Sequence, residues 1–188
     1  MLFWIILAVV AAVVIYTIAV FNRLVRTRQM VNEAWSGIDV QLKRRSDLVP
    51  NLVEAVKGYA AHERNVLQEV TELRGAARAL PSGDVAQRAQ AEGALSAALG
   101  KLFAVAENYP DLKASSNFLE LQQQLSDLEN ELQMARRYYN GAVRNLNVLV
   151  QSFPSNLLAG PLGFAQRDYF ELSDEAERAV PQVELAPR

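Results

Sequence analysis

The chain has no cysteine, one histidine and only 9 glycines among its 188 residues. Without cysteine it cannot form disulfides, thiolate metal sites or iron–sulfur clusters, and it has no cysteine nucleophile. The low glycine content and the 51% of hydrophobic residues exclude a disordered chain and suit a globular or helical one. The missing cysteines say nothing about the redox compartment, because such a chain suits either side of a membrane.

A strong net charge is also missing. The chain has 19 Lys and Arg against 21 Asp and Glu, which gives a formal net charge of -2 at pH 7. Binding to nucleic acid without sequence preference depends on a positive surface that neutralises phosphates. We therefore predict no nucleic-acid partner.

Catalytic and metal-binding motifs are scarce. His62 begins the sequence HERNV, which starts like a metalloprotease helix but has Val66 where the second histidine should be. Phosphate-binding glycine loops and nucleophile elbows are absent, and acid pairs such as Glu69 with Glu72 are expected on solvated helix faces. We predict a non-enzymatic protein without cofactor, metal or small-molecule substrate. A carboxylate-rich metal site at His62 is the alternative to a surface histidine.

The chain does have a long apolar run. Residues 2–21, LFWIILAVVAAVVIYTIAVF, are interrupted only by Tyr16 and Thr17. At ~1.5 Å per residue this run can cross a hydrocarbon core of about 30 Å. A cleaved signal peptide would have a basic start, a shorter apolar core and a small-residue cleavage site. Because these features are not found, we favour a retained transmembrane anchor over residues 1–22.

Three arginines follow the apolar run, at Arg23, Arg26 and Arg28. Positively charged residues next to a membrane span stay on the cytoplasmic side. We therefore predict a single-pass membrane protein with its N-terminus outside and its C-terminal body in the cytoplasm.

After the anchor, apolar residues recur at alternating steps of four and three, as in an amphipathic helix or coiled coil. The stripe keeps its phase from Leu24 to Leu80, which predicts one helix over this range. Pro50 lies within it and removes a hydrogen bond to the carbonyl of Ser46, so we expect a sharp kink or a break. Because the stripe keeps its phase across Pro50, we favour a kink within one structural unit over a linker between domains. Alternatively, Ser46 or Asp47 caps a new helix with Pro50 in its first turn.

Two further helices are predicted. The residues LPSGD at 80–84 form a turn with a capping aspartate, Asp84. Helical periodicity then covers 84–108 and 117–153. No run alternates with period two, so no strands are expected.

The predicted fold class is all-α. An N-terminal transmembrane helix leads into an elongated antiparallel helical bundle over residues 23–154. Residues 155–188 are expected to form a strap that docks around Phe164, Tyr169 and Phe170, followed by a loose acidic tail.

Charged residues near Pro50 are candidates for interaction. Arg45 falls on the apolar stripe, where it could reach a carboxylate on a neighbouring helix or fix helix register as a polar core position. Arg136 and Arg137 precede two tyrosines and could stack on nucleobases, but the charge balance favours a structural role. The candidate interaction or structural residues are Trp35, Asp39, Arg44, Arg45, Asp47, Pro50, Asn51, Arg136 and Arg137.

The segment AWSGIDVQLKRRSDLVPNLVEAVKGYAAHE, at 34–63, closely resembles the signature of the LemA family of bacterial membrane-anchored proteins. Further matches follow in order at 94–122, 135–140 and 153–164. The resemblance implies an N-terminal transmembrane helix with a very short external N-terminus, and a body that is a long antiparallel helical bundle. It implies no established catalytic activity, and some relatives are associated with building magnetosome membranes.

The chain departs from the family pattern in two places. Where the pattern has Glu-Asn-Arg and an isoleucine, this chain has Glu129, Asn130, Glu131 and Leu132, so that the charge at position 131 is reversed. Where a second Tyr-Asn pair is usual, it has Leu146 and Asn147.

These features predict a single-pass scaffold or assembly protein in the inner membrane of a bacterial cell envelope. It would act as a homo-oligomer or by binding another membrane protein. A regulatory adaptor for a membrane protease or secretion machine is the alternative. A membrane-proximal metal-dependent hydrolase is a third and less favoured hypothesis.

Overall fold

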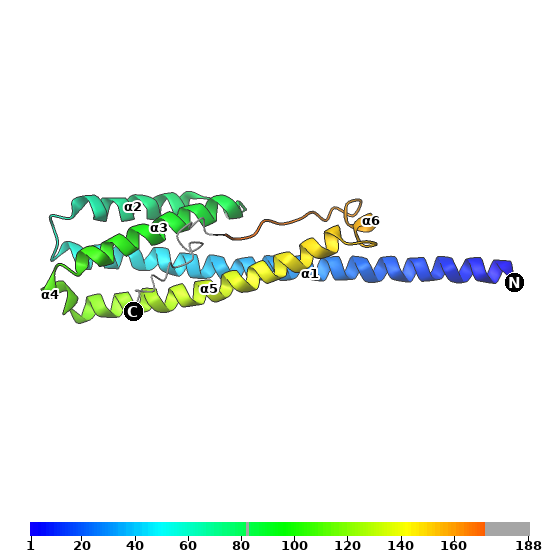
Figure 1. Ribbon diagram of the computed structural model, residues 1–188, viewed down its shortest axis with the longest axis horizontal. Coiled ribbons are helices and arrows are strands. Elements are labelled where there is room, and N and C mark those ends of the chain that lie inside the picture. Colours follow the sequence, from blue (N-terminus) through cyan, green and yellow to red (C-terminus); the bar gives the residue numbers. More distant parts are fainter. Residues whose placement is uncertain (82, 172–188) are drawn as a thin grey trace, which may run out of the picture. The chain divides into compact units, whose positions relative to one another are not determined.

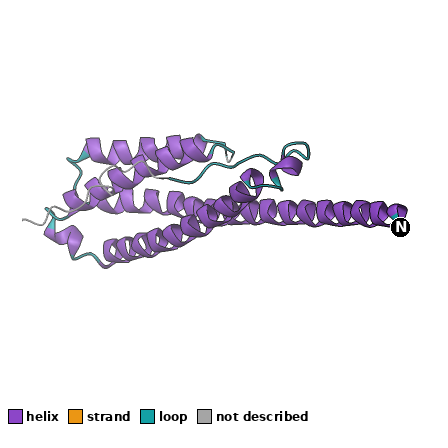
Figure 2. Cartoon of the chain, turned by 45° about the vertical axis from the view of Figure 1, so that its right-hand side comes forward, coloured by secondary structure: helices purple, strands orange, loops and turns teal. Residues whose placement is uncertain are grey.

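The computed structural model describes residues 1–81 and 83–171. These residues contain helices and no strand (Figures 1 and 2). The helices are α1 (Leu2–Lys57), α2 (Arg64–Ala79), α3 (Val85–Ala106), α4 (Pro110–Lys113), α5 (Ser116–Gln151) and α6 (Asn156–Ala159). The prediction of an all-α fold with a long N-terminal apolar helix is confirmed. The predicted acidic tail, over 172–188, lies outside the described residues.

The chain forms two compact units. The first combines Met1–Leu48 with Glu120–Phe170, and the second is built mainly from Val49–Leu119. Helices α1 and α5 each contribute residues to both units, whereas α2, α3 and α4 belong to the second unit and α6 to the first.

The N-terminal part of α1 is long and apolar enough to cross a membrane. Only 6% of its most apolar stretch is buried inside the protein. From Leu24 onward the same helix buries one face, with core residues at Leu24, Val31, Ala34, Ile38 and Leu42. One helix therefore changes from apolar on all sides to amphipathic at the end of the apolar run.

Helix α1 continues without interruption through Pro50 to Lys57. A break of the helix at Pro50 is therefore excluded, and so is the alternative of a new helix capped by Ser46 or Asp47, whereas the favoured kink at Pro50 stays a prediction. A proline inside a helix costs about 3 kcal/mol. The neighbouring side chains of Val49 and Leu52 are fully buried, and each such burial contributes about 1.5–3 kcal/mol. Packing thus outweighs the local cost of the proline.

The single helix predicted from Leu24 to Leu80 is also wrong, because α1 ends at Lys57 and α2 begins at Arg64. The turn between them is held by backbone bonds, among them Ala60 N–H to Val56 O at 2.8 Å. Ala60 is fully buried inside this turn. The spacing of apolar residues indicates which residues are buried, but not where a helix ends. A turn that keeps the same spacing therefore cannot be recognised from that spacing.

In the second unit α2 and α3 lie side by side (Figure 1). Asp84 caps α3 by accepting a hydrogen bond from the Gln87 N–H at 2.9 Å, as predicted. Lys101 of α3 pairs with Glu69 of α2 at 2.8 Å. Helices α3 and α5 lie close to the predicted ranges of 84–108 and 117–153.

Replacing Pro50 by alanine tests whether packing holds this proline in the helix. The variant regains one backbone N–H and loses the ring clash, so we expect it to raise the free energy of unfolding by about 1–3 kcal/mol. Urea denaturation of the detergent-solubilised protein, followed by circular dichroism, measures the change. Asn51→Ala, at the exposed neighbouring position, is the control and should gain less than about 0.7 kcal/mol. A Pro50→Ala variant no more stable than this control would contradict the interpretation.

Candidate interaction site

Within the first unit, α1 and α5 run antiparallel and in contact. The ring of Trp35 lies 5.5 Å from that of Tyr139, between centroids. Arg45 lies ten residues after Trp35 on α1, and its partner Glu129 lies ten residues before Tyr139 on α5. Each step forward along α1 therefore matches one step back along α5.

The ion pair between Arg45 and Glu129 places a buried charge in the contact between α1 and α5. The Arg45 Nη2 atom lies 3.5 Å from Glu129 Oε2, and the two side chains are 5% and 35% exposed. A buried guanidinium is tolerated only when paired, and the partly hydrated carboxylate lowers the desolvation cost. The prediction that Arg45 reaches a carboxylate on a neighbouring helix is confirmed.

The adjacent Arg44 makes a second ion pair, to Glu131 at 3.2 Å. Both side chains are well exposed, so this pair contributes at most about 1 kcal/mol. Glu131, whose charge is the reverse of that in the family pattern, therefore forms an ion pair in this chain. Glu129 and Glu131 leave α5 about 200° apart, at 100° per residue. Arg44 and Arg45 therefore meet α5 on opposite sides.

Two asparagines of α5 bind the backbone of the strap that follows α6. Asn147 donates to the Arg167 carbonyl at 2.9 Å and accepts from the Arg167 N–H at 2.8 Å. Asn140 makes the same two bonds to Phe170, at 3.2 and 2.9 Å. A side-chain amide offers a donor and an acceptor side by side, as the backbone of a neighbouring strand would. We call Asn140 and Asn147 the asparagine clamp.

The clamp holds a buried aromatic anchor. Phe170 is almost completely buried, with its ring 5.9 Å from Trp35 and 5.7 Å from the Arg136 guanidinium carbon. A cation over an aromatic face is stabilising, and more so when it is shielded from water. The predicted docking of the strap through Phe170 is confirmed, whereas Tyr169 keeps 40% of its surface exposed and is not an anchor.

Tyr139 adds a third bond to the strap, because its hydroxyl donates to the Asp168 carbonyl at 3.0 Å. Burial raises the pKa of the Tyr139 phenol above its ordinary value of 10.0, Arg167 lowers it, and Asp168 raises it. The net shift is upward, so the hydroxyl stays protonated and remains a donor at neutral pH.

Phe164 is the second predicted anchor, and it is buried. Gly163 has a φ of 74°, a conformation that favours glycine, and the next amide, of Phe164, bonds to the Ala159 carbonyl at 2.9 Å. The Phe164 ring lies 6.1 Å from Phe21, and the Arg28 guanidinium lies 4.8 Å above it. This turn therefore docks the strap against α1 as well.

Four of the predicted residues make contacts within the first unit. Trp35 and Arg136 lie beside the Phe170 ring, and Arg44 and Arg45 pair separately with glutamates of α5. Asp39 is half-buried on α1, and Pro50 lies in the interior of that helix. The exposed candidates are Asp47, Asn51 and Arg137.

Sequence reasoning missed the asparagine clamp and a buried pair in α3, between Arg88 Nε and Glu92 Oε1 at 3.7 Å. Arg88 also donates to the Leu80 carbonyl at 3.1 Å. The sequence feature that could have identified these residues is that they are polar and lie beside or among apolar core residues. Asn140 and Asn147 are also seven residues apart, which puts them on one face of α5.

His62 is exposed between α1 and α2, so the interpretation as a surface histidine is confirmed. Among residues 1–81 and 83–171, no group of three or more His, Asp or Glu side chains is placed to hold a metal ion.

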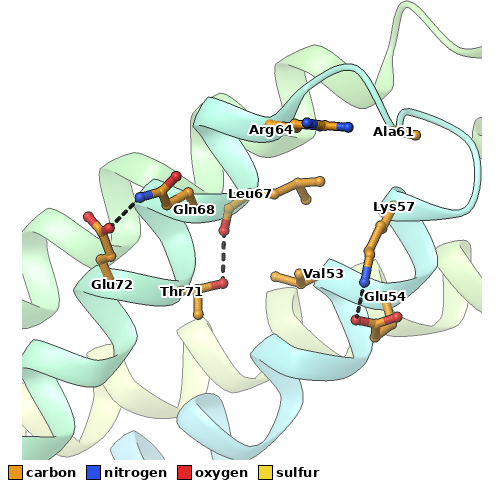
Figure 3. A pocket seen from close by; sticks show the side chains of 9 residues that line it. All are labelled: Val53, Glu54, Lys57, Ala61, Arg64, Leu67, Gln68, Thr71 and Glu72. Carbon is orange, nitrogen blue, oxygen red and sulfur yellow. Dashed lines mark hydrogen bonds and ion pairs between the residues drawn. The ribbon is translucent and has the colours of Figure 1, made fainter.

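An open groove of about 770 Å³ lies in the second unit, between the end of α1 and α2 (Figure 3). Val53 and Leu67 contribute apolar walls. Polar lining groups bond to one another, as in Lys57 with Glu54 at 3.3 Å and Gln68 with Glu72 at 2.7 Å. These pairs are ordinary helix-surface interactions between residues three or four apart. The groove therefore presents a mixed surface in place of an arranged set of catalytic groups.

Comparison with known proteins decides the family. The model of the LemA family matches residues 34–185. The chain belongs to the LemA family. It is 28% identical to protein LemA of Metamycoplasma hominis over 166 residues, which cover 87% of this chain and 74% of that protein. It is also 25% identical to magnetosome protein MamQ 2 of Paramagnetospirillum magneticum over 195 residues, covering 89% and 72%. The resemblance predicted from the LemA signature is confirmed.

Truncating Arg45 separates the buried ion pair from the exposed one. Arg45→Ala removes a buried stem and leaves Glu129 without this partner, so we expect the free energy of unfolding to fall by about 3 kcal/mol. Arg44→Ala, the matched control, should cost less than about 1 kcal/mol because its pair is hydrated. Thermal or urea unfolding of both variants in detergent measures the difference. Equal losses would show that burial does not distinguish the two pairs.

Truncating one asparagine should release one end of the clamp. In Asn147→Ala the Arg167 amide loses its acceptor, so we expect its hydrogen exchange to speed up about tenfold, the equivalent of one hydrogen bond. The Phe170 amide should remain protected because Asn140 still holds it. Asn145→Ala, at an exposed position of the same helix, is the control. Unchanged exchange at Arg167 would rule out the clamp.

Proposed function

We propose that this LemA-family chain is a non-enzymatic, single-pass scaffold of the bacterial envelope that assembles with a second copy of itself. The apolar part of α1 supplies the membrane anchor, and Arg23, Arg26 and Arg28 favour a cytoplasmic body. Relatives named magnetosome proteins are in keeping with a membrane-associated role.

The observation that carries the proposal is the division of the family signature between the inside and the surface of the first unit. Trp35 and Arg45 are used in internal packing. Arg44 and Asp47 are exposed. Val40 precedes them on α1, on the side of the apolar run, and has 56% of its surface exposed. Internal packing therefore accounts for only part of the signature.

The exposed residues share one side of α1. Positions 40, 44 and 47 are separated by four and three residues, so their side chains are neighbours on the helix surface. Both charge signs are present next to an exposed aliphatic group, a mixture that is usual in protein–protein interfaces. The acid and base on this face also suit two copies facing each other, since Arg44 of one copy can meet Asp47 of the other.

A second hypothesis is that the same face binds another envelope protein, as an adaptor for a membrane protease or secretion machine would. The exposed polar and apolar residues at 40–47 would serve either partner. The chemistry of the described residues favours binding over catalysis, because Arg44, Arg45 and Lys101 form ion pairs with glutamates of a neighbouring helix and so stabilise helix contacts.

Photo-crosslinking in intact membranes tests the proposal. A photoreactive amino acid at Val40 should yield a covalent adduct of twice the chain mass, because the side chain would lie in the interface. Gln133, exposed on the side of α5 opposite Glu131, is the matched control and should yield little. Asp47→Lys should weaken the Val40 adduct while the circular dichroism spectrum is unchanged. A dominant heterologous adduct would favour the adaptor hypothesis, and no protein adduct would exclude both.

A further inference from the structure

The packed part of the first unit begins immediately where the apolar run of α1 ends. Phe21 is the last residue of that run, and Leu24, three residues later, is already fully buried. Three residues of helix rise by only about 4.5 Å. If residues 2–21 cross a membrane, the end of the first unit lies at the lipid headgroups with no linker between them.

The register of α1 and α5 identifies which part of the chain lies at this end. Trp35 contacts Tyr139 and Arg45 pairs with Glu129, and the same register continued towards the N-terminus brings Phe21 level with Phe153. Helix α5 ends just before this point, at Gln151. The direct contact between Phe21 and Phe164 gives the same placement independently. Figures 1 and 2 both show α6 beside α1 at this level.

The segment at this end carries large apolar side chains on its surface. Phe153 is 79% exposed, Leu157 63% and Leu162 41%. Residues 145–166 contain no Asp, Glu, Lys, Arg or His. Helix α6 directs Ala159 inward, where it is fully buried, and Leu157 outward. A contiguous exposed apolar segment without charge marks an interaction surface more often than a solvated loop.

We infer that residues 153–162 insert into the interfacial layer of the membrane leaflet from which α1 emerges. The occupant of this surface is lipid, because the surface is continuous with the apolar run of α1 through the Phe21–Phe164 contact. Aromatic and aliphatic side chains at headgroup depth are favourable there, and the exposed Arg23 and Arg26 lie at the level of lipid phosphates. The inference rests on the proposed membrane anchor. It gives the first unit a second attachment, which restricts its tilt and rotation about α1.

Site-directed spin labelling of the full chain tests this insertion, and the cysteine-free sequence allows one cysteine to be introduced at a time. Leu157→Cys and Leu162→Cys would carry nitroxides in nanodiscs of phosphatidylcholine and phosphatidylglycerol, with one protein per disc. Collision with oxygen reports lipid, and collision with a water-soluble nickel chelate reports water. Val40→Cys is the matched control, since it is similarly exposed and lies about 28 Å beyond Phe21 along the same helix.

We expect the ratio of oxygen to nickel accessibility at positions 157 and 162 to exceed that at position 40 several-fold. Val9→Cys reports the membrane span itself. If Val9 lies in lipid but positions 157 and 162 match position 40, the insertion is overturned and the anchor stands. Labels at 157 and 162 that are shielded from both reagents would mean that protein covers the segment, and this also overturns the inference. A water-accessible Val9 would overturn the anchor and the insertion together.

Discussion

The antiparallel register of α1 against α5 is the constraint on which the rest of the first unit depends. Trp35 against Tyr139 and Arg45 against Glu129 both fix the same alignment. This alignment sets where α5 ends relative to the apolar run of α1. It also places both Trp35 and Arg136 next to the Phe170 ring, and so forms the site in which the strap is anchored.

Helical periodicity predicted the elements whose structure follows from burial alone. The stripe in α5 gives its length almost completely, and Arg45 stood out because it is a charge on an apolar stripe. The same reasoning failed at Gly58–Glu63, because a turn that preserves phase leaves the pattern of apolar residues unchanged. At Pro50 it allowed a break that does not occur, because local rules weigh a lost hydrogen bond, whereas the folded helix also gains the burial of Val49 and Leu52.

The candidate site was less predictable than the fold. The family signature drew attention to Trp35 and Arg45, but not to the asparagine clamp, because pairing between a side-chain amide and a backbone segment 20 or 30 residues away has no period. The signature also could not separate residues used inside the first unit from those on its surface. Arg44 and Arg45 are adjacent in sequence, yet one is hydrated and the other buried. The apolar stripe singles out Arg45, but only the packing of α5 shows which glutamate each arginine contacts.

A buried Arg–Glu pair is a costly way to hold two helices together, since apolar residues of similar volume are often as stabilising or more so. What a polar pair adds is selection of one register, because a purely apolar seam of the same period can slip by a heptad. In a soluble bundle such a slip merely rearranges the core. Here α1 is also the proposed anchor, and a slip of one heptad would move the end of α5 by about 10.5 Å relative to the lipid. Residues 153–162 would then leave the headgroup layer. On this view Arg45 and Glu129 hold the uncharged segment at the depth of the membrane surface.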